Sequence, residues 1–232
     1  MTDRPLKSSA GSDIPVIAVD GPAGVGKGTL AKYLATKYDF NYLDSGAIYR
    51  VVALAAIEQG LDSAEIDDIV ECASNLHISF PAEKNYSAHS NNIDIDNQIR
   101  SEACSSMASR IAAEPVIRAQ LLMLQKRFQR PPGLVCDGRD MGTVVFPEAK
   151  VKIFLDASVQ QRAERRYKQL IEKGISANFA HLFDSISSRD ERDRSRASSP
   201  LVAAEDAWVI DTTEMTIEKV IGAATDYIDK TL

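Results

Sequence analysis

A glycine-rich turn with a single lysine is the first stretch whose residue types could do chemistry. It reads DGPAGVGKGT over residues 20–29, and its segment 21–27 fits the pattern G-x-x-x-x-G-K. Glycines let backbone N–H groups converge on phosphate oxygens, and a following helix N-terminus adds partial positive charge. Lys27 would bring a mobile point charge to the β- and γ-phosphates. The predicted polyphosphate site consists of Gly21, Pro22, Ala23, Gly24, Val25, Gly26, Lys27, Gly28 and Thr29.

The residue after the lysine departs from the usual pattern. That position commonly holds Ser or Thr, whose hydroxyl meets Mg²⁺, but here it is Gly28, with Thr29 next. The hydroxyl is therefore either displaced by one position or replaced. A turn with a merely exposed lysine is the alternative, but the apolar run before it and the helical spacing after it favour the phosphate site. No N-K-x-D stretch occurs, so a guanine-specific switch would lack its usual base reader.

Arginines recur far along the chain, in segments well separated from the turn. Phosphoryl transfer between two nucleotides brings many negative charges together, so it needs cations that converge from several segments. The candidates are Arg50, Arg118, Arg139, Arg165, Arg166, Arg189, Arg192, Arg194 and Arg196.

The elements that must position these residues alternate along the chain. Apolar runs rich in β-branched residues at 14–20, 40–46, 133–140, 150–158 and 207–213 predict five buried strands, separated by helical patterns. This order predicts an α/β, three-layer fold around a five-stranded parallel sheet.

An insertion interrupts this alternation. Residues 76–80 and 92–99 alternate in the manner of strands and predict an antiparallel hairpin. Residues 101–130 are helical in pattern, and Pro115 should break or kink that helix. The polar residues 1–13 are expected to form a flexible tail.

Composition narrows the function classes. The chain has 232 residues and a net charge of −6, which disfavours a general nucleic-acid binder. No apolar run is long enough to span a bilayer, so no membrane role is expected. Cys72, Cys104 and Cys136 lack metal or C-x-x-C spacing and suggest buried, reduced thiols. These features predict a cytoplasmic protein.

Four further motifs carry a resemblance to a known family. The loop variant G-x-x-G-x-G-K-G-T is similar to nucleoside monophosphate kinases. The stretches LDSGAIYR (43–50), DGRDMGTVVFP (137–147), KIFLDAS (152–158) and RDERDRSR (189–196) follow in family order. From about Ile14 to the C-terminus, the chain therefore resembles bacterial cytidylate kinases. One departure is Ala23, where many relatives carry Ser.

The resemblance implies a P-loop NTPase-type fold with an inserted monophosphate-binding domain and a short lid. It implies ATP-dependent phosphorylation of CMP and dCMP by direct in-line transfer, with Mg²⁺, in a monomer. The implied division is a tail (1–13), a P-loop core (14–46, 110–163 and 181–232), a CMP-binding domain (47–109) and a lid (164–180).

The resemblance also assigns an acceptor site. Asp140 would accept the cytosine N4 amine, Arg118 would donate to N3 and O2, and Ser109 would assist. On the residues alone, the default interpretation is a helix or loop cap for Asp140 and a surface helix charge for Arg118. A uracil would offer Asp140 a carbonyl and be repelled.

The remaining acceptor residues would hold the phosphate and the sugar. The predicted phosphate ligands are Ser45, Arg50, Arg139 and Arg196. The sugar hydroxyls would be held by Arg189 and Asp193, while Arg192 and Arg194 are expected to point elsewhere. A salt-bridged, solvated helix face is the alternative for residues 189–196.

On the donor side, Lys27 and the loop amides would hold ATP with Arg165 and Arg166 of the lid. The residues predicted to be catalytic are Lys27, Arg139, Arg165 and Arg196. Thr29 and Asp137 are expected to meet Mg²⁺ through water or substrate phosphates, although Asp137 could instead be a capping carboxylate. We expect His77, His89 and His181 to be structural or surface residues, and Phe154 and Trp208 to lie in the core.

Three alternatives stay open at this point. A kinase for AMP, for UMP and CMP together, or for a small metabolite would share the phosphate loop. A P-loop NTPase or switch would hydrolyse nucleotide without an acceptor. A binding module would hold nucleotide without turnover.

Overall fold

The computed structural model describes residues 14–61, 65–172 and 174–232. The predicted tail at 1–13 lies outside the described residues. Among those described, every helix is too short or too polar to cross a bilayer.

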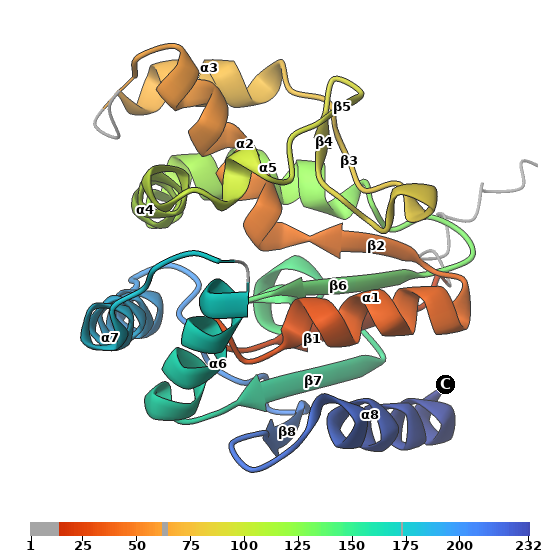
Figure 1. The fold of residues 1–232 in the computed structure, drawn as a ribbon. Helices are drawn as coiled ribbons and strands as arrows, with labels where there is room; N and C mark the ends of the chain where they lie inside the picture. Colours follow the sequence, from red (N-terminus) through yellow and green to blue (C-terminus); the bar gives the residue numbers. More distant parts are fainter. Residues whose placement is uncertain (1–13, 62–64, 173) are drawn as a thin grey trace, which may run out of the picture.

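A parallel sheet forms the centre of the molecule (Figure 1). Its five strands lie in the order β2-β6-β1-β7-β8, which confirms the predicted parallel sheet. The bounds are β1 (Val16–Asp20), β2 (Asn41–Asp44), β6 (Leu134–Gly138), β7 (Val151–Asp156) and β8 (Trp208–Asp211). All residues of β1 and β6 are buried, as expected for strands covered on both faces. In register, Asp44 faces Asp137 and Asp20 faces Gly138, so the strands end together at one edge.

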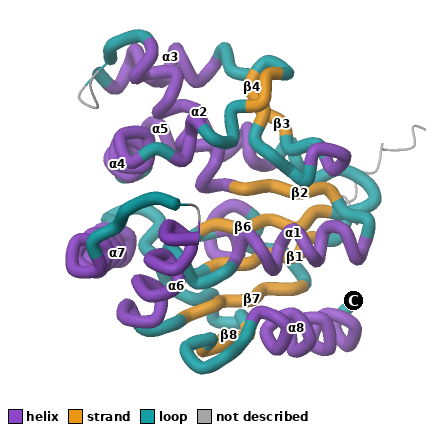
Figure 2. The backbone as a smooth tube through the Cα atoms, viewed as in Figure 1, coloured by secondary structure: helices purple, strands orange, loops and turns teal. Residues whose placement is uncertain are grey.

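Helices lie along this sheet and at the carboxyl ends of its strands, as the tube in Figure 2 shows. They are α1 (Lys27–Tyr38), α6 (Val159–Glu172), α7 (Phe179–Ser195) and α8 (Ile217–Thr231), with a single π-helical turn η3 (Met141–Val145) after β6. Helix α1 contacts β6 and α8, while α6 packs against α7. The sheet and its helices form the predicted three-layer P-loop arrangement.

The insertion between β2 and β6 contains helices and a small second sheet. Its helices are α2 (Ser45–Glu58), α3 (Ile66–Ser74), α4 (Glu102–Ile111) and α5 (Pro115–Lys126), with 3₁₀ turns η1 (Ala82–Lys84) and η2 (Gln98–Arg100). Pro115 occupies the first turn of α5, so the predicted break in the helix is confirmed. Helix α5 packs against α3, across the predicted boundary after residue 109. The domain division itself stays a prediction.

The predicted antiparallel strands are present, but a third strand lies between the two expected arms. Three short antiparallel strands, β3 (Ile78–Ser79), β4 (His89–Ser90) and β5 (Ile93–Asp94), form the sheet in the order β3-β4-β5. The two expected arms therefore do not pair with each other. The reason is a tight turn at Asn91 and Asn92, with φ of 50° and 66°, which folds β4 onto β5. Asparagine tolerates this left-handed conformation, and such turns join adjacent strands.

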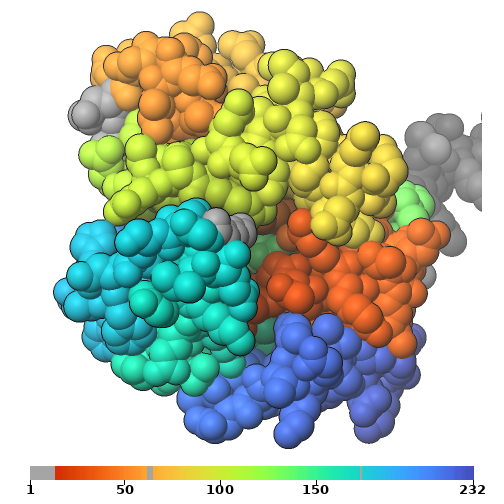
Figure 3. Space-filling model, in the orientation of Figure 1, coloured from red at the N-terminus to blue at the C-terminus, as the bar shows by residue number. Residues whose placement is uncertain are grey.

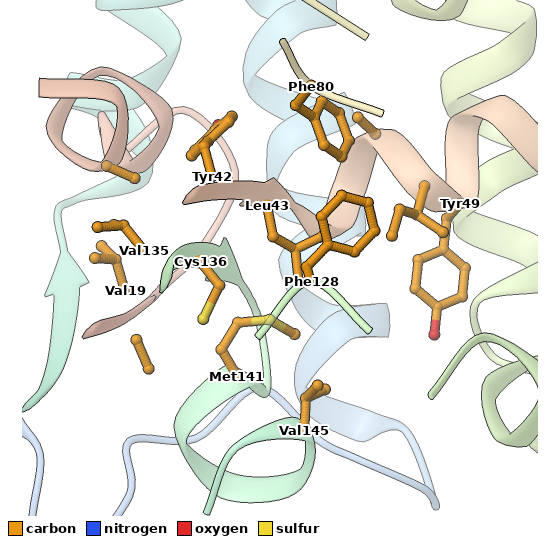
Figure 4. Packing of buried hydrophobic residues seen from close by; sticks show 14 of the residues in the cluster. Val19, Tyr42, Leu43, Tyr49, Phe80, Phe128, Val135, Cys136, Met141 and Val145 are labelled. Atoms are coloured by element: carbon orange, nitrogen blue, oxygen red, sulfur yellow. The ribbon is translucent and has the colours of Figure 1, made fainter. Parts of the chain in front are cut away.

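An aromatic cluster joins the insertion to the central sheet (Figure 4). The ring of Tyr42 on β2 lies 5.8 Å from that of Phe80 and 5.2 Å from that of Tyr86, and Phe80 lies 5.6 Å from Phe128. These rings pack the insertion against β2.

Other core predictions can be compared directly with the packing. Phe154 is buried, as predicted, whereas Trp208 is only half-buried and stacks on Tyr227 with ring centroids 4.7 Å apart. His89 is buried, in accord with a structural role. All three cysteines are buried free thiols, as predicted.

Candidate active site

The glycine-rich turn joins β1 to α1 and has the backbone geometry that glycine allows. Gly21, Gly24 and Gly26 adopt φ of 145°, 79° and 99°. A Cβ at Gly21 would lie 2.1 Å from the Leu155 carbonyl oxygen, so this position requires glycine. Gly26 is the N-cap of α1, which places the positive end of that helix at the turn.

Lys27 folds back over this turn. Its ammonium donates to the Pro22 carbonyl at 2.7 Å, and the side chain is only 6% exposed. Burial, and then the nearby Arg139 guanidinium, lower the pKa of Lys27 to about 7. A buried ammonium with this pKa would gain strongly from a bound anion, and the phosphate-binding role of Lys27 stays a prediction.

Two buried carboxylates, Asp137 on β6 and Asp20 on β1, lie at the strand ends beside the turn. Asp137 accepts a hydrogen bond from the Tyr42 hydroxyl at 2.7 Å, and burial together with Asp44 raises its pKa to about 7. Thr29, the other predicted contact to Mg²⁺, is exposed on the first turn of α1. The hydrogen bond from Tyr42 fixes the position of the Asp137 carboxylate, whose oxygens could coordinate a cation at this edge of the sheet.

Asp20 is a site residue that sequence reasoning missed. It accepts hydrogen bonds from the N–H groups of Met141 at 2.9 Å and Gly142 at 2.8 Å. Burial raises its pKa to about 6, although the two backbone bonds oppose the shift. The signal in the sequence was a carboxylate ending an otherwise apolar strand, directly before the first glycine of the turn.

The predicted base-reading residues lie together. Arg118 on α5 forms a buried ion pair with Asp140, and also donates to Ser199 Oγ and the Ala112 carbonyl, both at 3.2 Å. Its guanidinium lies 5.7 Å from the centroid of the Tyr49 ring. Four contacts therefore fix the orientation of Arg118 beside Asp140.

Two buried hydroxyls in the described part of the insertion lack partners, and that of Tyr49 belongs to the ring beside this pair. The hydroxyls of Ser109 and Tyr49 are buried and have no hydrogen-bond partner among the described residues. Ser109 was a predicted site residue, but in this structure it does not bond to Arg118 or Asp140. Buried hydroxyls without partners are costly, so they favour a polar ligand here.

Asp193 on α7 collects three of the predicted arginines. Arg139 Nε donates to Asp193 Oδ2 at 2.9 Å, Arg196 bonds to Oδ1, and Arg189 Nε lies 4.0 Å from Oδ2. Asp193 is 1% exposed; burial opposes its ionisation, yet the three guanidinium groups hold the pKa of its carboxyl below its usual range. Residues 189, 193 and 196 therefore share one face of the chain, as predicted, and it is not a solvated face.

Positive charge exceeds negative charge in this cluster. Burial, then repulsion from Arg139 and Arg50, lower the pKa of Arg189 to about 9. The Nε atoms of Arg189 and Arg196 have no hydrogen-bond partner within the described chain. Such a cluster is suited to an anion such as a nucleotide phosphate. Arg192 and Arg194 are exposed, in accord with their predicted exclusion, and Arg194 lies 3.7 Å from Asp156.

Ser45 and Arg50 lie on α2, at the start of the insertion. Ser45 donates its hydroxyl proton to Gln125 Oε1 at 2.7 Å, and Gln125 is a second residue that sequence reasoning missed. Burial lowers the pKa of Arg50, and its carbonyl accepts from the Cys104 thiol at 3.1 Å. A polar residue at a buried helix position was the only sequence signal for Gln125.

The predicted donor-side arginines are not gathered at the turn. Arg165 donates to the Thr212 carbonyl at 2.6 Å and to the Met215 carbonyl at 3.4 Å, and Arg166 is exposed. Instead, Arg162 reaches the turn, donating to the Ala23 carbonyl at 3.1 Å. The surface in Figure 3 is hollowed where α1, the insertion and the α6–α7 region meet.

The geometry combines a phosphate turn, a base-reading pair and an arginine cluster, and comparison with known proteins identifies the family. Residues 17–230 match the family profile described as cytidylate kinase. The chain belongs to the cytidylate kinase family. This membership confirms the resemblance predicted from the motifs and makes the protein a nucleoside monophosphate kinase.

Family members of known name are similar over nearly their whole length. The cytidylate kinase of Vibrio parahaemolyticus is 50% identical, and the match covers 95% of this chain and 98% of the relative. The cytidylate kinase of Pectobacterium atrosepticum is 52% identical, with 92% of this chain and 95% of the relative covered. A Yersinia enterocolitica cytidylate kinase is 51% identical over 94% of this chain.

Proposed function

We propose that this cytidylate kinase family member transfers the γ-phosphoryl group of ATP directly to CMP or dCMP, giving ADP and CDP or dCDP. The observation that carries the proposal is the buried Arg118–Asp140 pair, beside an arginine cluster and close to the phosphate turn. Asp140 immediately precedes Met141, whose N–H bonds to Asp20 at the base of that turn. The carboxylate of Asp20 thus links the segment proposed to recognise the base to the turn proposed to bind phosphate.

Recognition of the base follows from donor and acceptor chemistry. The Asp140 carboxylate accepts from the N4 amine of cytosine, and the Arg118 guanidinium donates to N3 and O2. The direct bond between them holds both groups ready, so little side-chain ordering is needed on binding. UMP presents a carbonyl in place of the amine, and its oxygen would face the carboxylate. Ser109, buried with a free hydroxyl, assists at this site.

The acceptor phosphate binds in the arginine cluster. Arg50, Arg139 and Arg196 neutralise this phosphate. The Ser45 hydroxyl also donates to it, either when its bond to Gln125 breaks or when the Gln125 amide rotates and donates to Ser45 Oγ. Arg189 and Asp193 hold the sugar hydroxyls. Because several guanidinium groups are buried with incomplete partners, an anion lowers the energy of the whole cluster.

The donor nucleotide binds at the glycine-rich turn. Its phosphates accept from the turn N–H groups and from the Lys27 ammonium, whose pKa rises again when the anion is present. Arg165 and Arg166 act from the lid segment 164–180, whose described part is the second half of α6, a short connection and the start of α7. Closure of this segment would exclude water, which otherwise competes as phosphoryl acceptor.

The residues at the sheet edge fit Mg²⁺. Asp137 offers a buried carboxylate oxygen, and its raised pKa reflects burial and the nearby Asp44, a situation that a cation relieves. Thr29 offers an exposed hydroxyl in the first turn of α1. When bound with the nucleotide, Mg²⁺ neutralises charge on the transferring phosphates. Asp137 would hold the ion through its water, since Mg²⁺ retains most of its hydration shell.

We further propose that the enzyme acts as a monomer in the cytoplasm. Its three cysteines are unpaired, as is typical of proteins from reducing compartments.

The experiment measures ATP consumption with CMP, dCMP, UMP, AMP or no acceptor. We expect strong stimulation by CMP and dCMP and little by AMP, with CDP or dCDP formed in equal amount to ADP. ATP consumption that does not depend on an acceptor would favour an NTPase instead. Nucleotide binding without turnover would favour a binding module.

A further inference from the structure

The guanidinium group of Arg162 lies where two parts of the proposed site meet. Arg162 is in the first half of α6 and is 1% exposed. Its Nε donates to the Ala157 carbonyl at 3.0 Å, and Nη1 donates to the Ala23 carbonyl at 3.1 Å. Nη1 also donates to Asp190 Oδ1 at 3.0 Å, while Nη2 bonds to Oδ2. One side chain thus binds the glycine-rich turn and helix α7 at once.

Ala23 and Asp190, which both bond to Arg162, belong to segments that are proposed to bind different substrates. Ala23 lies in the turn that holds the ATP phosphates. Asp190 lies on α7 between Arg189 and Asp193, which are proposed to hold the acceptor sugar. A shift of either segment would therefore have to move the other or break these bonds.

Stability alone does not account for a buried ion pair at this position. Removing two charges from water is costly, and well-packed apolar residues of similar size often stabilise a core as well or better. An apolar side chain could not, however, donate to the Ala23 carbonyl. The turn also rests directly on this residue, since a Cβ at Gly24 would lie 3.5 Å from the Arg162 Cβ.

We infer that Arg162, held by Asp190, is a positioning residue that fixes the donor phosphate turn relative to the acceptor helix α7. This inference rests on the proposed kinase function. In-line transfer requires close alignment of donor and acceptor, and a misplacement of about 1 Å can cost roughly 100-fold in rate. Loss of the link lowers the turnover of the complex with both nucleotides, but it leaves each nucleotide's own binding contacts in place.

Two variants separate positioning from folding. The double variant Arg162→Met with Asp190→Leu replaces the ion pair by apolar groups but removes the bond to Ala23. Arg162→Lys keeps a positive charge beside Asp190 but lacks the guanidinium fork that reaches both partners. Arg194→Met is the matched control, because Arg194 is an exposed arginine on α7, the helix that carries Asp190, and its partner is Asp156 rather than the turn.

The measurements are kcat and KM with ATP and CMP, the thermal unfolding midpoint, and calorimetric affinities for ADP alone and CMP alone. We expect kcat to fall at least about tenfold in both Arg162 variants, with each affinity changing less than about threefold. Arg194→Met should match the wild type. A folded Arg162 variant with kcat within twofold of the wild type would overturn the inference. So would a loss of turnover matched by an equal loss of ADP or CMP affinity. Absence of CMP-dependent ATP consumption in the wild type would instead refute the proposed function.

Discussion

The carboxylate of Asp20 accepts hydrogen bonds from the backbone N–H groups of Met141 and Gly142, at 2.9 Å and 2.8 Å. Asp20 directly precedes the phosphate turn, and Met141 directly follows the proposed base-reading residue Asp140. The end of β1 is therefore bound to the loop after β6 at the point where the two substrates would meet. A change at Asp20 should consequently affect both halves of the site.

Asp20→Asn tests this bond through the pH dependence of folding. Burial raises the pKa of Asp20 to about 6, so the folded state holds a proton that the unfolded chain releases near pH 4. Through this group, the free energy of unfolding falls as the pH rises from about 4 to about 6, by up to about 3 kcal/mol. Urea unfolding at several pH values should show that Asp20→Asn removes this decline.

The control for that measurement is Asp226→Asn, which removes an exposed carboxylate from α8. It should keep the decline seen in the wild type. An Asp20→Asn profile parallel to that of the wild type would show that Asp20 is ionised throughout the range.

Asp140→Ala should affect the acceptor far more than the donor. The substitution removes the carboxylate that faces the cytosine amine and leaves Arg118 buried without its ionic partner. We expect kcat/KM for CMP to fall at least about 100-fold, corresponding to about 3 kcal/mol, while the affinity for ATP changes little. Steady-state kinetics and ATP titration measure the two effects. An equal loss of both would show that Asp140 does not read the base.

Two glycines of the turn should respond differently to alanine. At Gly21 a Cβ would meet the Leu155 carbonyl oxygen at 2.1 Å, so Gly21→Ala should prevent normal folding. At Gly26 the nearest atom to a Cβ, on Ile217, is 3.9 Å away, so Gly26→Ala should cost only the strain of its φ of 99°, about 1–3 kcal/mol. Circular dichroism and thermal unfolding compare the two. Similar stabilities would contradict the predicted clash.

Arg165→Met should act on the donor side alone. Arg165 bonds to the Thr212 and Met215 carbonyls, in the connection that leads to α8 and reaches the turn through Ile217. We expect the KM for ATP to rise about three- to tenfold with no change in the KM for CMP. The exposed Arg166, changed to Met, is the comparison, and a larger effect there would assign the main donor contact to Arg166. An increase in the KM for CMP with Arg165→Met would place Arg165 on the acceptor side.

Local patterns were sufficient to predict much of the fold. The strands β1, β6 and β7 are apolar runs that are buried on both faces. The conformation of the turn is set by its own glycines, so neither prediction depends on distant residues. The antiparallel character of the small sheet was predicted, but its middle strand was not, because that pairing depends on the left-handed conformation of Asn91 and Asn92, which hydrophobic alternation does not encode.

The residues missed in the site share a physical cause. Arg162, Arg165 and Arg166 lie within five consecutive residues, and only packing of α6 against α7 decides that Arg162 faces inward. Gln125 and Asp20 likewise gain their roles from partners about 80 and 121 residues away. The motif resemblance brought Arg118 and Asp140 to one site, but their direct bond to each other emerged only from the packed chain.

All three cysteines are buried, so the surface of the described part of this protein carries no native thiol. The buried environment raises the pKa of each thiol, so maleimide reagents should react with them slowly. A cysteine introduced on the exposed half of α6 and another on α3 could then carry a fluorophore pair without deleting any native residue. The separation of those dyes would report in real time whether either substrate changes the distance between α3 and α6.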